Sequence, residues 1–325
     1  MQFLNFIKKQ AYTALHIGDY LNSIRFFRQR YEWLHKKYPF TWLDDKFFLE
    51  FYFLKKMGYH LNIKNPTTIN EKLNWMKLYD RDPVYIQISD KWQCRDYVSQ
   101  KIGTKYLKPL LGVYDSVKDI NWQELPEKFV VKVTHGSGWN IICDDITKFD
   151  KANAEEVIKQ WLAQNYYHKV REWQYKGIQP RITIEPLLEG DPEHGLVEYE
   201  IYCFNGIAKF VQVDIDCNNA HTRLFLTPDW QKMPFTIIRF PTFEGIFPKP
   251  QNFDEALLLA EKLTKSMPFC RVDLHIIDGL IFVSEMTLQP AGGFMRFEPA
   301  EYDSKIGSLI NLKEHHERRP FTVKK

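Results

Sequence analysis

The fold is decided by the stretch Arg271-Val272-Asp273-Leu274-His275-Ile276-Ile277-Asp278-Gly279-Leu280-Ile281-Phe282-Val283-Ser284-Glu285-Met286-Thr287. Two runs of alternating apolar and polar residues flank Asp278-Gly279, a dipeptide typical of tight hairpin turns, so the stretch predicts two antiparallel strands. With a three-residue loop, 277–279, Asp273 and Glu285 share one face, and Leu280 and Phe282 join the apolar face. A two-residue loop would put Glu285 among the apolar side chains, so the alternation favours the three-residue loop.

The predicted register gives the hairpin a polar face. Asp273 then lies opposite Val283 and Arg271 opposite Glu285, which makes the two carboxylates diagonal neighbours roughly 7 Å apart. Such like charges repel unless a cation lies between them. Mg²⁺ or Mn²⁺ suits this position, because hard cations take carboxylate oxygens and nucleotide phosphates. The hairpin alone is equally compatible with a solvent-facing surface that carries ordinary charges.

Length and composition indicate a soluble globular protein. The 325 residues are enough for a large core in two or three lobes, and 44% are hydrophobic and 26% charged. A net charge of +3 is too small to indicate nucleic-acid binding. The five cysteines lack CxxC spacing, which predicts reduced thiols in the cytoplasm rather than disulfides or a zinc site. No membrane-spanning apolar run and no signal peptide are recognised.

Residues 1–60 are predicted to be helical and basic, with apolar residues at helical spacing. Two interpretations stay open for this extension. Residues 1–45 could contact the inner face of the membrane or a partner, or they could be amphipathic helices packed on the main body, which we favour. Another helix is expected over 47–57, with Gly58 as its C-cap.

Two further helices are expected before the first strands. Thr67 or Thr68 is the predicted N-cap of the first, and Ser89 or Asp90 that of the second. Lys91 and Arg95 are four residues apart, so they would share a face of the second helix. That pair could be a phosphate clamp or a solvated basic face.

The segment 129–143 predicts a strand, a glycine-rich loop and a second strand. Lys132 interrupts the first apolar strand, and a buried ammonium needs an anionic partner. In the loop, Gly136-Ser137-Gly138 lets backbone N–H groups approach an anion closely. Together these features favour a hairpin that grips phosphate. It is not a Walker loop, because no Gly-Lys-Ser/Thr sequence follows.

The remaining segments supply a helix and further strands. A helix is expected over 150–167, followed by an aromatic and basic run that could line a sugar site or form a lid. Pro186 restricts the strand 181–188 to an edge or exit position. Asn205-Gly206 predicts a second hairpin, and the loop 289–294 could lie close to a ligand.

These motifs resemble those of ATP-grasp enzymes. Lys132 with its glycine loop, the strand that ends in Glu185-Pro186-Leu187-Leu188, and the 271–293 region occur in the order that these enzymes use. The stretches 65–77, 89–98, 110–116, 129–143 and 269–293 are similar to the TupA-like branch, which is associated with teichuronopeptide and cell-surface polysaccharide biosynthesis. The resemblance covers about 45–312. It implies an α+β ATP-grasp fold: a helical extension (1–60), a preceding region (61–120) and two lobes that clamp ATP (121–190 and 191–325).

The resemblance also implies roles for individual residues. The implied nucleotide-binding residues are Lys91, Lys132, Gly136, Ser137, Gly138, Glu185, Leu188 and Glu198, with Glu185 and Leu188 at the adenine and Glu198 at the ribose. The implied metal ligands are Asp273, Glu285 and Thr287, and the catalytic cations are Arg271 and Lys132. Two positions depart from the family pattern: many ATP-grasp enzymes have Asn at the position of Thr287, and related sequences often have Lys at that of Glu200.

The implied activity is that of an ATP-dependent carboxylate–amine ligase that uses Mg²⁺ or Mn²⁺, forms an acyl phosphate and releases an amide, in cell-surface or capsular polysaccharide biosynthesis. Its partners would be a glycan or small-molecule carboxylate and an amine donor. A glycosyltransferase-type enzyme is a second hypothesis, in which the carboxylate pair would hold the metal of a nucleotide-sugar; Lys132 and its glycine loop argue against it. A catalytically inactive nucleotide-binding scaffold is a third, motivated by Thr287 and Glu200.

Overall fold

The structure, a computed structural model, describes residues 44–217 and 220–312. Its internal contacts divide the chain into residues 1–60 and 61–325. In the first part, helix α3 (Asp45–Met57) begins after Asp44, whose carboxylate accepts a hydrogen bond from Phe47 N, and ends at Gly58 with φ 83°. The predicted helix and its glycine C-cap are therefore confirmed. The basic helices predicted before residue 44 lie outside the described residues.

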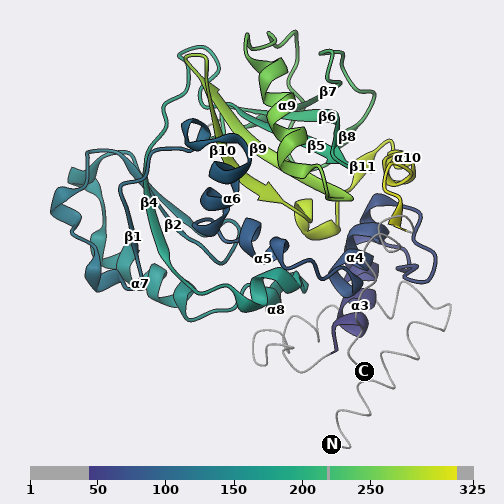
Figure 1. The fold of residues 1–325 in the computed structure, drawn as a ribbon, viewed down its shortest axis with the longest axis horizontal. Helices are drawn as coiled ribbons and strands as arrows, with labels where there is room; N and C mark the ends of the chain where they lie inside the picture. The colour runs from purple at the N-terminus through teal and green to yellow at the C-terminus, as the bar shows by residue number, and fades with distance from the viewer. Residues whose placement is uncertain (1–43, 218–219, 313–325) are drawn as a thin grey trace, which may run out of the picture. The chain divides into compact units, whose positions relative to one another are not determined.

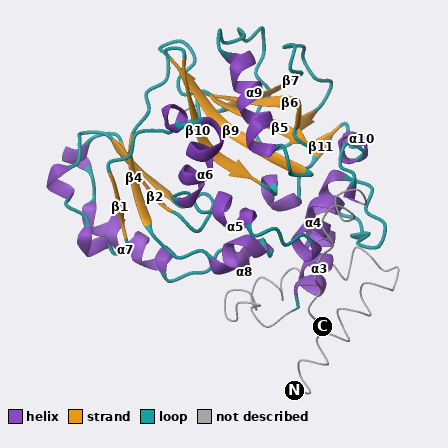
Figure 2. Cartoon of the chain, in the orientation of Figure 1, coloured by secondary structure: helices purple, strands orange, loops and turns teal. Residues whose placement is uncertain are grey.

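The described part of residues 61–325 is built on three antiparallel sheets (Figures 1 and 2). The first has the strand order β1 (Gly112–Tyr114), β4 (Ile182–Pro186), β2 (Phe129–Val133), β3 (Asn140–Cys143). The second has the order β10 (Leu280–Thr287), β9 (Phe269–Ile277), β5 (Glu198–Phe204), β6 (Ile207–Ile215), β7 (Thr222–Leu226). A small third sheet pairs β11 (Phe297–Glu298) with β8 (Thr236–Ile237).

The helices of this part are α4 (Ile69–Tyr79), α5 (Val84–Ser89), α6 (Gln93–Ile102), α7 (Lys151–Leu162), α8 (Tyr167–Val170), α9 (Phe253–Thr264) and α10 (Tyr302–Gly307). Helix α7 covers the first sheet by burying Ile158 against Phe129, Val131 and Ile184. Helix α9 covers one face of the five-stranded sheet (Figure 1). The predicted α+β arrangement is confirmed. Within the described residues, no helix has both the length and the hydrophobicity that a membrane crossing requires.

Helix α4 begins as the sequence predicts. Thr68 accepts a hydrogen bond from Glu71 N at 3.1 Å, and the Glu71 carboxylate accepts one from Thr68 N at 3.1 Å, which completes a capping box. The next prediction is only partly right. Asp90 accepts hydrogen bonds from Trp92 N and Gln93 N, but α6 begins at Gln93. Lys91 therefore precedes the helix and shares no helical face with Arg95.

The hairpin of β9 and β10 differs from the predicted register. Leu280 pairs with Ile277 across a two-residue turn, in which Asp278 and Gly279 have φ values of 49° and 73°. A β-bulge at Ser284 then shifts the register, so that Glu285 pairs directly with Asp273. The three-residue loop was wrong, yet the two acids still share a face because the bulge inserts one residue.

The bulge also explains which apolar residues of β10 are buried. Ile281 and Val283 pack with Leu274 in the core under α9, whereas Leu280 is 60% exposed. The predicted placement of Leu280 and Phe282 on the apolar face was therefore wrong. The two-residue turn determines which side chains of β10 face the core up to Val283. The bulge at Ser284 then shifts the alternation of side chains by one residue, so that Glu285 faces the polar side.

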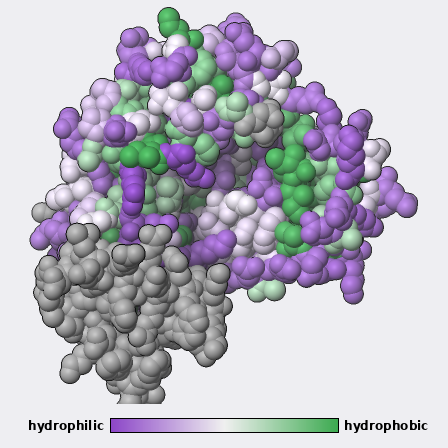
Figure 3. All heavy atoms as spheres, turned by 180° about the vertical axis from the view of Figure 1, so that it is seen from behind, coloured by the Kyte–Doolittle hydropathy of each residue, from purple (hydrophilic) through white to green (hydrophobic). Residues whose placement is uncertain are grey.

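The other face of the five-stranded sheet changes from apolar to polar along its strands. Phe204, Phe210 and Phe269 are buried under α4 and α10. Farther along, Glu200 pairs with Asp273 and Tyr202 with Arg271 on the same face. The helices that cover the apolar part leave this polar part facing two cavities. Seen from behind, the surface is largely polar, with a narrow apolar strip on the side of the first sheet (Figure 3).

Candidate functional site

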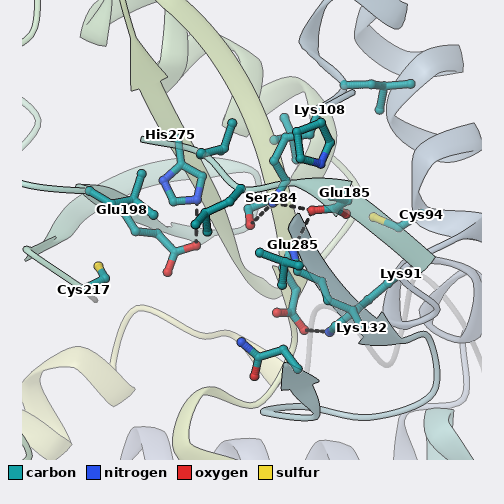
Figure 4. Close-up of a pocket in the computed structure, with 18 of the residues that line it drawn as sticks. Lys91, Cys94, Lys108, Lys132, Glu185, Glu198, Cys217, His275, Ser284 and Glu285 are labelled. Carbon is teal, nitrogen blue, oxygen red and sulfur yellow. Dashed lines mark hydrogen bonds and ion pairs between the residues drawn. The ribbon is translucent and has the colours of Figure 1, made fainter. Parts of the chain in front are cut away.

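A cavity of about 270 Å³ lies between the two large sheets. Lys132 of β2 and Glu185 of β4 line it from the first sheet, and Glu198 of β5 and Glu285 of β10 line it from the second. Lys91, which precedes α6, completes the ring of charged side chains that Figure 4 shows around this space. Both sheets therefore contribute charged groups to one cavity.

Lys132 has the anionic partner that a lysine in an apolar strand requires. Its Nζ lies 2.7 Å from Glu185 Oε2, and Lys108 Nζ lies 3.3 Å from the same oxygen. Lys108 Nζ also donates to Ser284 Oγ at 3.0 Å, which links this cluster to the bulge of β10. The cluster holds two cations against one carboxylate, so it carries a net positive charge at the cavity wall.

The pKa values reflect this unequal charge. Burial raises the pKa of Glu185, but the ammonium groups of Lys108 and Lys132 outweigh it and lower the pKa to about 2. Burial and the neighbouring Lys132 lower the pKa of Lys108 to about 8. For Lys132 burial acts in the same direction, but Glu185 outweighs it, so the pKa of Lys132 is raised. Glu185 thus stays ionised and retains Lys132 as a cation.

The glycine loop between β2 and β3 is fixed at its ends and exposed in its middle. His135 is buried, and its Nε2 lies 3.1 Å from Trp161 O at the end of α7. A Cβ atom on Gly136 would lie 2.4 Å from the Trp139 ring, so no larger residue fits there. Ser137 and Gly138 are exposed, and Gly138 has φ 70°. The loop can present its backbone N–H groups to an anion beside Lys132.

The end of β4 and the start of β5 form another wall of the cavity. Leu188 lines it two residues after Pro186, which is the last residue of β4. Glu198 Oε1 lies 3.8 Å from His275 Nε2, and the other ring nitrogen of His275 is hydrogen-bonded to Val197 O at 2.8 Å. Leu188 supplies apolar surface and Glu198 a carboxylate, a combination that suits a planar base next to a hydroxylated sugar.

The acid pair of the hairpin is held by cations. Arg271 donates from Nε and Nη2 to the two oxygens of Asp273, both at 2.7 Å, and Thr287 Oγ1 donates to Asp273 Oδ2 at 3.1 Å. Glu285 Oε1 lies 3.0 Å from Lys91 Nζ. Burial raises the pKa of Asp273 to about 7 although Arg271 acts against it. Burial alone would raise the pKa of Glu285 as well, but the ammonium of Lys91 outweighs burial, so the pKa of Glu285 is lowered.

The donor set fits a hard divalent cation. Glu200 pairs with Asp273 across β5 and β9, and its buried Oε2 has no hydrogen-bond partner, although Arg271 Nη1 lies 2.9 Å away. Oxygens of Asp273, Glu285 and Thr287 lie on the same polar face. Among residues 44–217 and 220–312, no three His, Cys, Asp or Glu side chains are arranged to hold a metal ion by themselves. Phosphate oxygens would have to complete the coordination, as is usual for Mg²⁺.

A second cavity of about 370 Å³ adjoins the first. Gly138 and Glu285 line both cavities. The second is also lined by Ser137, Arg271 and Thr287. Gly138 of the glycine loop and Glu285 of β10 thus lie between the two cavities.

The structure brings most of the predicted residues together. Lys91, Lys132, Gly138, Glu185, Leu188, Glu198 and Glu285 line the first cavity, and Ser137, Gly138, Arg271, Glu285 and Thr287 line the second. Gly136 and Asp273 line neither, but each contacts a residue that does: Gly136 contacts Trp139, and Asp273 is bonded to Arg271 and Thr287.

Sequence reasoning missed two functional candidates. Lys108 lies in an irregular stretch before Pro109, and nothing local indicates its ion pair with Glu185. Glu172 lines the second cavity but lies within the aromatic and basic run, where only the cations attracted attention. The only signal for Glu172 in the sequence was its position as an acidic residue among many basic ones.

Comparisons with known proteins find one family and several similar structures. The family described as TupA-like ATPgrasp matches residues 71–311. The structure is similar to D-alanine–D-alanine ligase from Bacillus anthracis, at 16% identity and a TM-score of 0.41, over 71% of this chain and 70% of that one. It is also similar to D-alanine–D-alanine ligase from Helicobacter pylori, at 12% identity and a TM-score of 0.38, over 79% and 68%. The macrocyclase MdnC from Microcystis aeruginosa, solved with its precursor peptide MdnA, is similar at 13% identity and a TM-score of 0.37, over 70% and 63%. No curated protein sequence matches significantly.

Proposed function

The chain belongs to the TupA-like ATP-grasp family, and from this premise we propose that it is an ATP-dependent ligase that joins a carboxylate to an amine. One observation supports this most directly. Lys132 of the first sheet and Glu285 of the second line the same cavity, beside a glycine loop that can bind phosphate. A cation on one wall and an acid pair on the other suit a nucleotide triphosphate with its metal.

The nucleotide would occupy the first cavity. Lys132 and Lys91 would contact its phosphates, and the loop of Gly136, Ser137 and Gly138 would cover them. Glu185 and Leu188 would lie at the base through backbone groups, and Glu198 at the ribose hydroxyls. The cavity lining supports this assignment, because it contains Lys91, Lys132, Gly138 and Leu188 together.

The reaction would proceed in two steps. A substrate carboxylate would attack the terminal phosphoryl group of ATP and form an acyl phosphate, and an amine would then displace phosphate. Lys132 lines the first cavity and Arg271 the second, and these cations would stabilise the charge that develops on the transferred group. Asp273, Glu285 and Thr287 would hold Mg²⁺ or Mn²⁺. The metal would supply positive charge shared by the phosphate oxygens.

We also propose the setting of the reaction. The family association favours cell-surface or capsular polysaccharide biosynthesis, with a uronic-acid sugar or an amino acid as the carboxylate. The protein would work in the cytoplasm, and contact of residues 1–45 with the inner membrane face is the alternative to their packing on the main body. Co-sedimentation of the full chain and of a variant lacking 1–45 with anionic liposomes tests the membrane contact, and equal binding by both would contradict it.

Thermal shift and product analysis test the proposed activity. The protein is incubated with ATP–Mg²⁺ or with a panel of sugar nucleotides, and ADP is measured with candidate carboxylates and amines. We expect stabilisation by ATP–Mg²⁺ and ADP that forms only with a carboxylate present. Stabilisation by a sugar nucleotide but not by ATP would instead support a glycosyltransferase.

One observation favours a non-catalytic nucleotide-binding scaffold as a second candidate. Arg271 lies 2.9 Å from Glu200 and is hydrogen-bonded to Asp273, so two buried acids hold a proposed catalytic cation. Stabilisation by ATP without ADP formation, across a broad set of carboxylates and amines, would decide for the scaffold.

A further inference from the structure

Glu172 lies in the wall of the second cavity, on the segment between α8 and β4. The residue is 7% exposed. Its side chain makes no hydrogen bond or ion pair within 4.0 Å with any described residue. A buried carboxylate without a bonded partner is costly unless the site uses it.

The other carboxylates in this wall are already paired. Of the three described carboxylates that line the cavity, Glu200 lies 2.9 Å from Arg271 and Glu285 lies 3.0 Å from Lys91. Glu172 alone has no such neighbour. It is therefore the carboxylate whose oxygens are available to a ligand in the cavity.

A buried lysine holds the Glu172 segment in place. Lys77 of α4 is 0% exposed, and its Nζ donates to Val170 O at 3.0 Å, to Gly292 O and to Asn74 Oδ1. It thereby joins α4 to the end of α8 and to the loop after β10, where Val170 and Gly292 line the cavity. The ammonium of Lys77 also interacts favourably with the Glu172 carboxylate, so the carboxylate is electrostatically supported without being bonded.

From this arrangement, and resting on the proposed ligase function, we propose that Glu172 is the catalytic base that removes a proton from a primary amine bound in the second cavity. The ammonium form of the amine gives one proton to the Glu172 carboxylate. The free amine then attacks the carbonyl carbon of the acyl phosphate, the new C–N bond forms and the C–O bond to phosphate breaks. The departing phosphate carries away the second proton of the nitrogen, which leaves the amide and the protonated Glu172.

The electrostatic surroundings suit this role. Burial raises the pKa of Glu172 to about 7, while Lys77 acts in the opposite direction. A base titrating near neutral pH is ionised often enough to accept a proton and strong enough to take it from an ammonium group. Tyr175 and Tyr202 also line the cavity, but burial raises the pKa of each phenol, so both stay neutral.

Two nucleophiles separate base catalysis from every other role of Glu172. The full-length protein is first assayed with ATP–Mg²⁺, hydroxylamine and a panel of D-glucuronate, D-galacturonate and L-amino acids, which identifies the carboxylate by its hydroxamate. Glycine, L-alanine and ethanolamine then replace hydroxylamine. Hydroxylamine is already unprotonated at neutral pH and needs no base, whereas these amines do.

We expect Glu172→Gln to lower the kcat of amide formation by about 10² to 10⁴-fold and to change hydroxamate formation by less than about threefold. Glu172→Asp keeps the charge but shortens its reach, so it should show the same split if Glu172→Gln does not fold. The exposed Glu124→Gln is the matched control and should change neither rate. Equal losses with both nucleophiles, or no loss with either, would overturn the role of Glu172. If the unaltered protein forms no hydroxamate, the ligase function itself fails, and the role of Glu172 with it.

Discussion

Asp273 and Glu285 are direct partners across β9 and β10. Each carboxylate is paired with its own cation, and the two cations come from different parts of the chain. Arg271, two residues along β9, is bonded to Asp273, whereas Lys91, which precedes α6, is bonded to Glu285. The pair therefore brings two carboxylates together with their charge partly neutralised. The negative charge available to a divalent cation is therefore smaller than that of two free carboxylates, so phosphate oxygens must also coordinate the cation.

Asp273→Asn tests the metal role of this pair. The amide keeps the shape and one oxygen but loses the charge, so metal-dependent ATP turnover should fall by about 10- to 100-fold. Titration of Mg²⁺ in an ADP-release assay measures the loss. Asp278→Asn is the matched control in the same hairpin, because Asp278 is exposed and Asn also tolerates its positive φ. If Asp273→Asn unfolds the protein globally, as circular dichroism would reveal, the role of Asp273 is structural.

Deletion of Ser284 tests the bulge. Without the extra residue, Val283 and Leu274, Glu285 and Asp273, and Met286 and Val272 would still be partners in an unbroken ladder, so Glu285 should stay on the polar face. We therefore expect a soluble, folded variant that loses the local bend of the bulge and the hydrogen bond between Lys108 and Ser284.

Ser284→Ala is the matched control for the deletion. It keeps the register and loses only the hydrogen bond from Lys108, which is worth about 0.5 to 1.5 kcal/mol. Urea unfolding measures both variants. An insoluble or unfolded deletion variant would contradict this expectation and show that the bulge itself is needed for folding.

Lys132→Met tests the phosphate contact. A charge-assisted contact of this kind is worth about 1.5 to 3 kcal/mol, so the affinity for ATP should fall by about 10- to 100-fold. Calorimetric titration with ATP–Mg²⁺ measures it. Lys128→Met serves as the control, because Lys128 lies just before β2 and its Nζ contacts the exposed Glu189 outside the cavity. Equal losses in both variants would contradict a specific role for Lys132.

The ion pairs of Glu185 predict a pH dependence of stability. The folded-state pKa of about 2 lies below the ordinary value of 4.5. The ionised carboxylate therefore stabilises the folded state above about pH 4.5, and this contribution is lost as the pH falls toward 2. It amounts to at most about 3 kcal/mol.

Urea unfolding between pH 2.5 and 6 measures this contribution. The stability difference between the unaltered protein and Glu185→Gln should narrow as the pH falls. Glu124→Gln should show no such trend. A difference that stays constant across this range would mean that the lysines do not lower the pKa of Glu185.

Local sequence features predicted much of the secondary structure. Asp278-Gly279 gave the hairpin, Gly58 the end of α3, and Thr67 or Thr68 the start of α4, because each of these signals acts over a few neighbouring residues. Family resemblance then predicted which motifs share a cavity. Their shared position between two sheets is a tertiary property that no short-range pattern contains.

Two features could not be predicted for the same reason. Alternation assumes an unbroken ladder, whereas the bulge at Ser284 depends on Ile281 and Val283 packing under α9 and on Lys108 reaching Ser284. Likewise, Lys108 is 77 residues from Glu185 in sequence, and the pairing of the chain around β1 with β4 brings the two side chains 3.3 Å apart. Both features depend on contacts between distant segments.

The wall of Gly138 and Glu285 between the two cavities has a thermodynamic consequence. A molecule that orders this partition from one chamber changes the surface that a second molecule meets in the other. If binding of the first molecule increases the affinity for the second by some factor, binding of the second must increase the affinity for the first by the same factor. Two substrates can thus favour each other's binding without touching. The dissociation constant of one, measured at increasing concentrations of the other, would give the size and sign of this reciprocity.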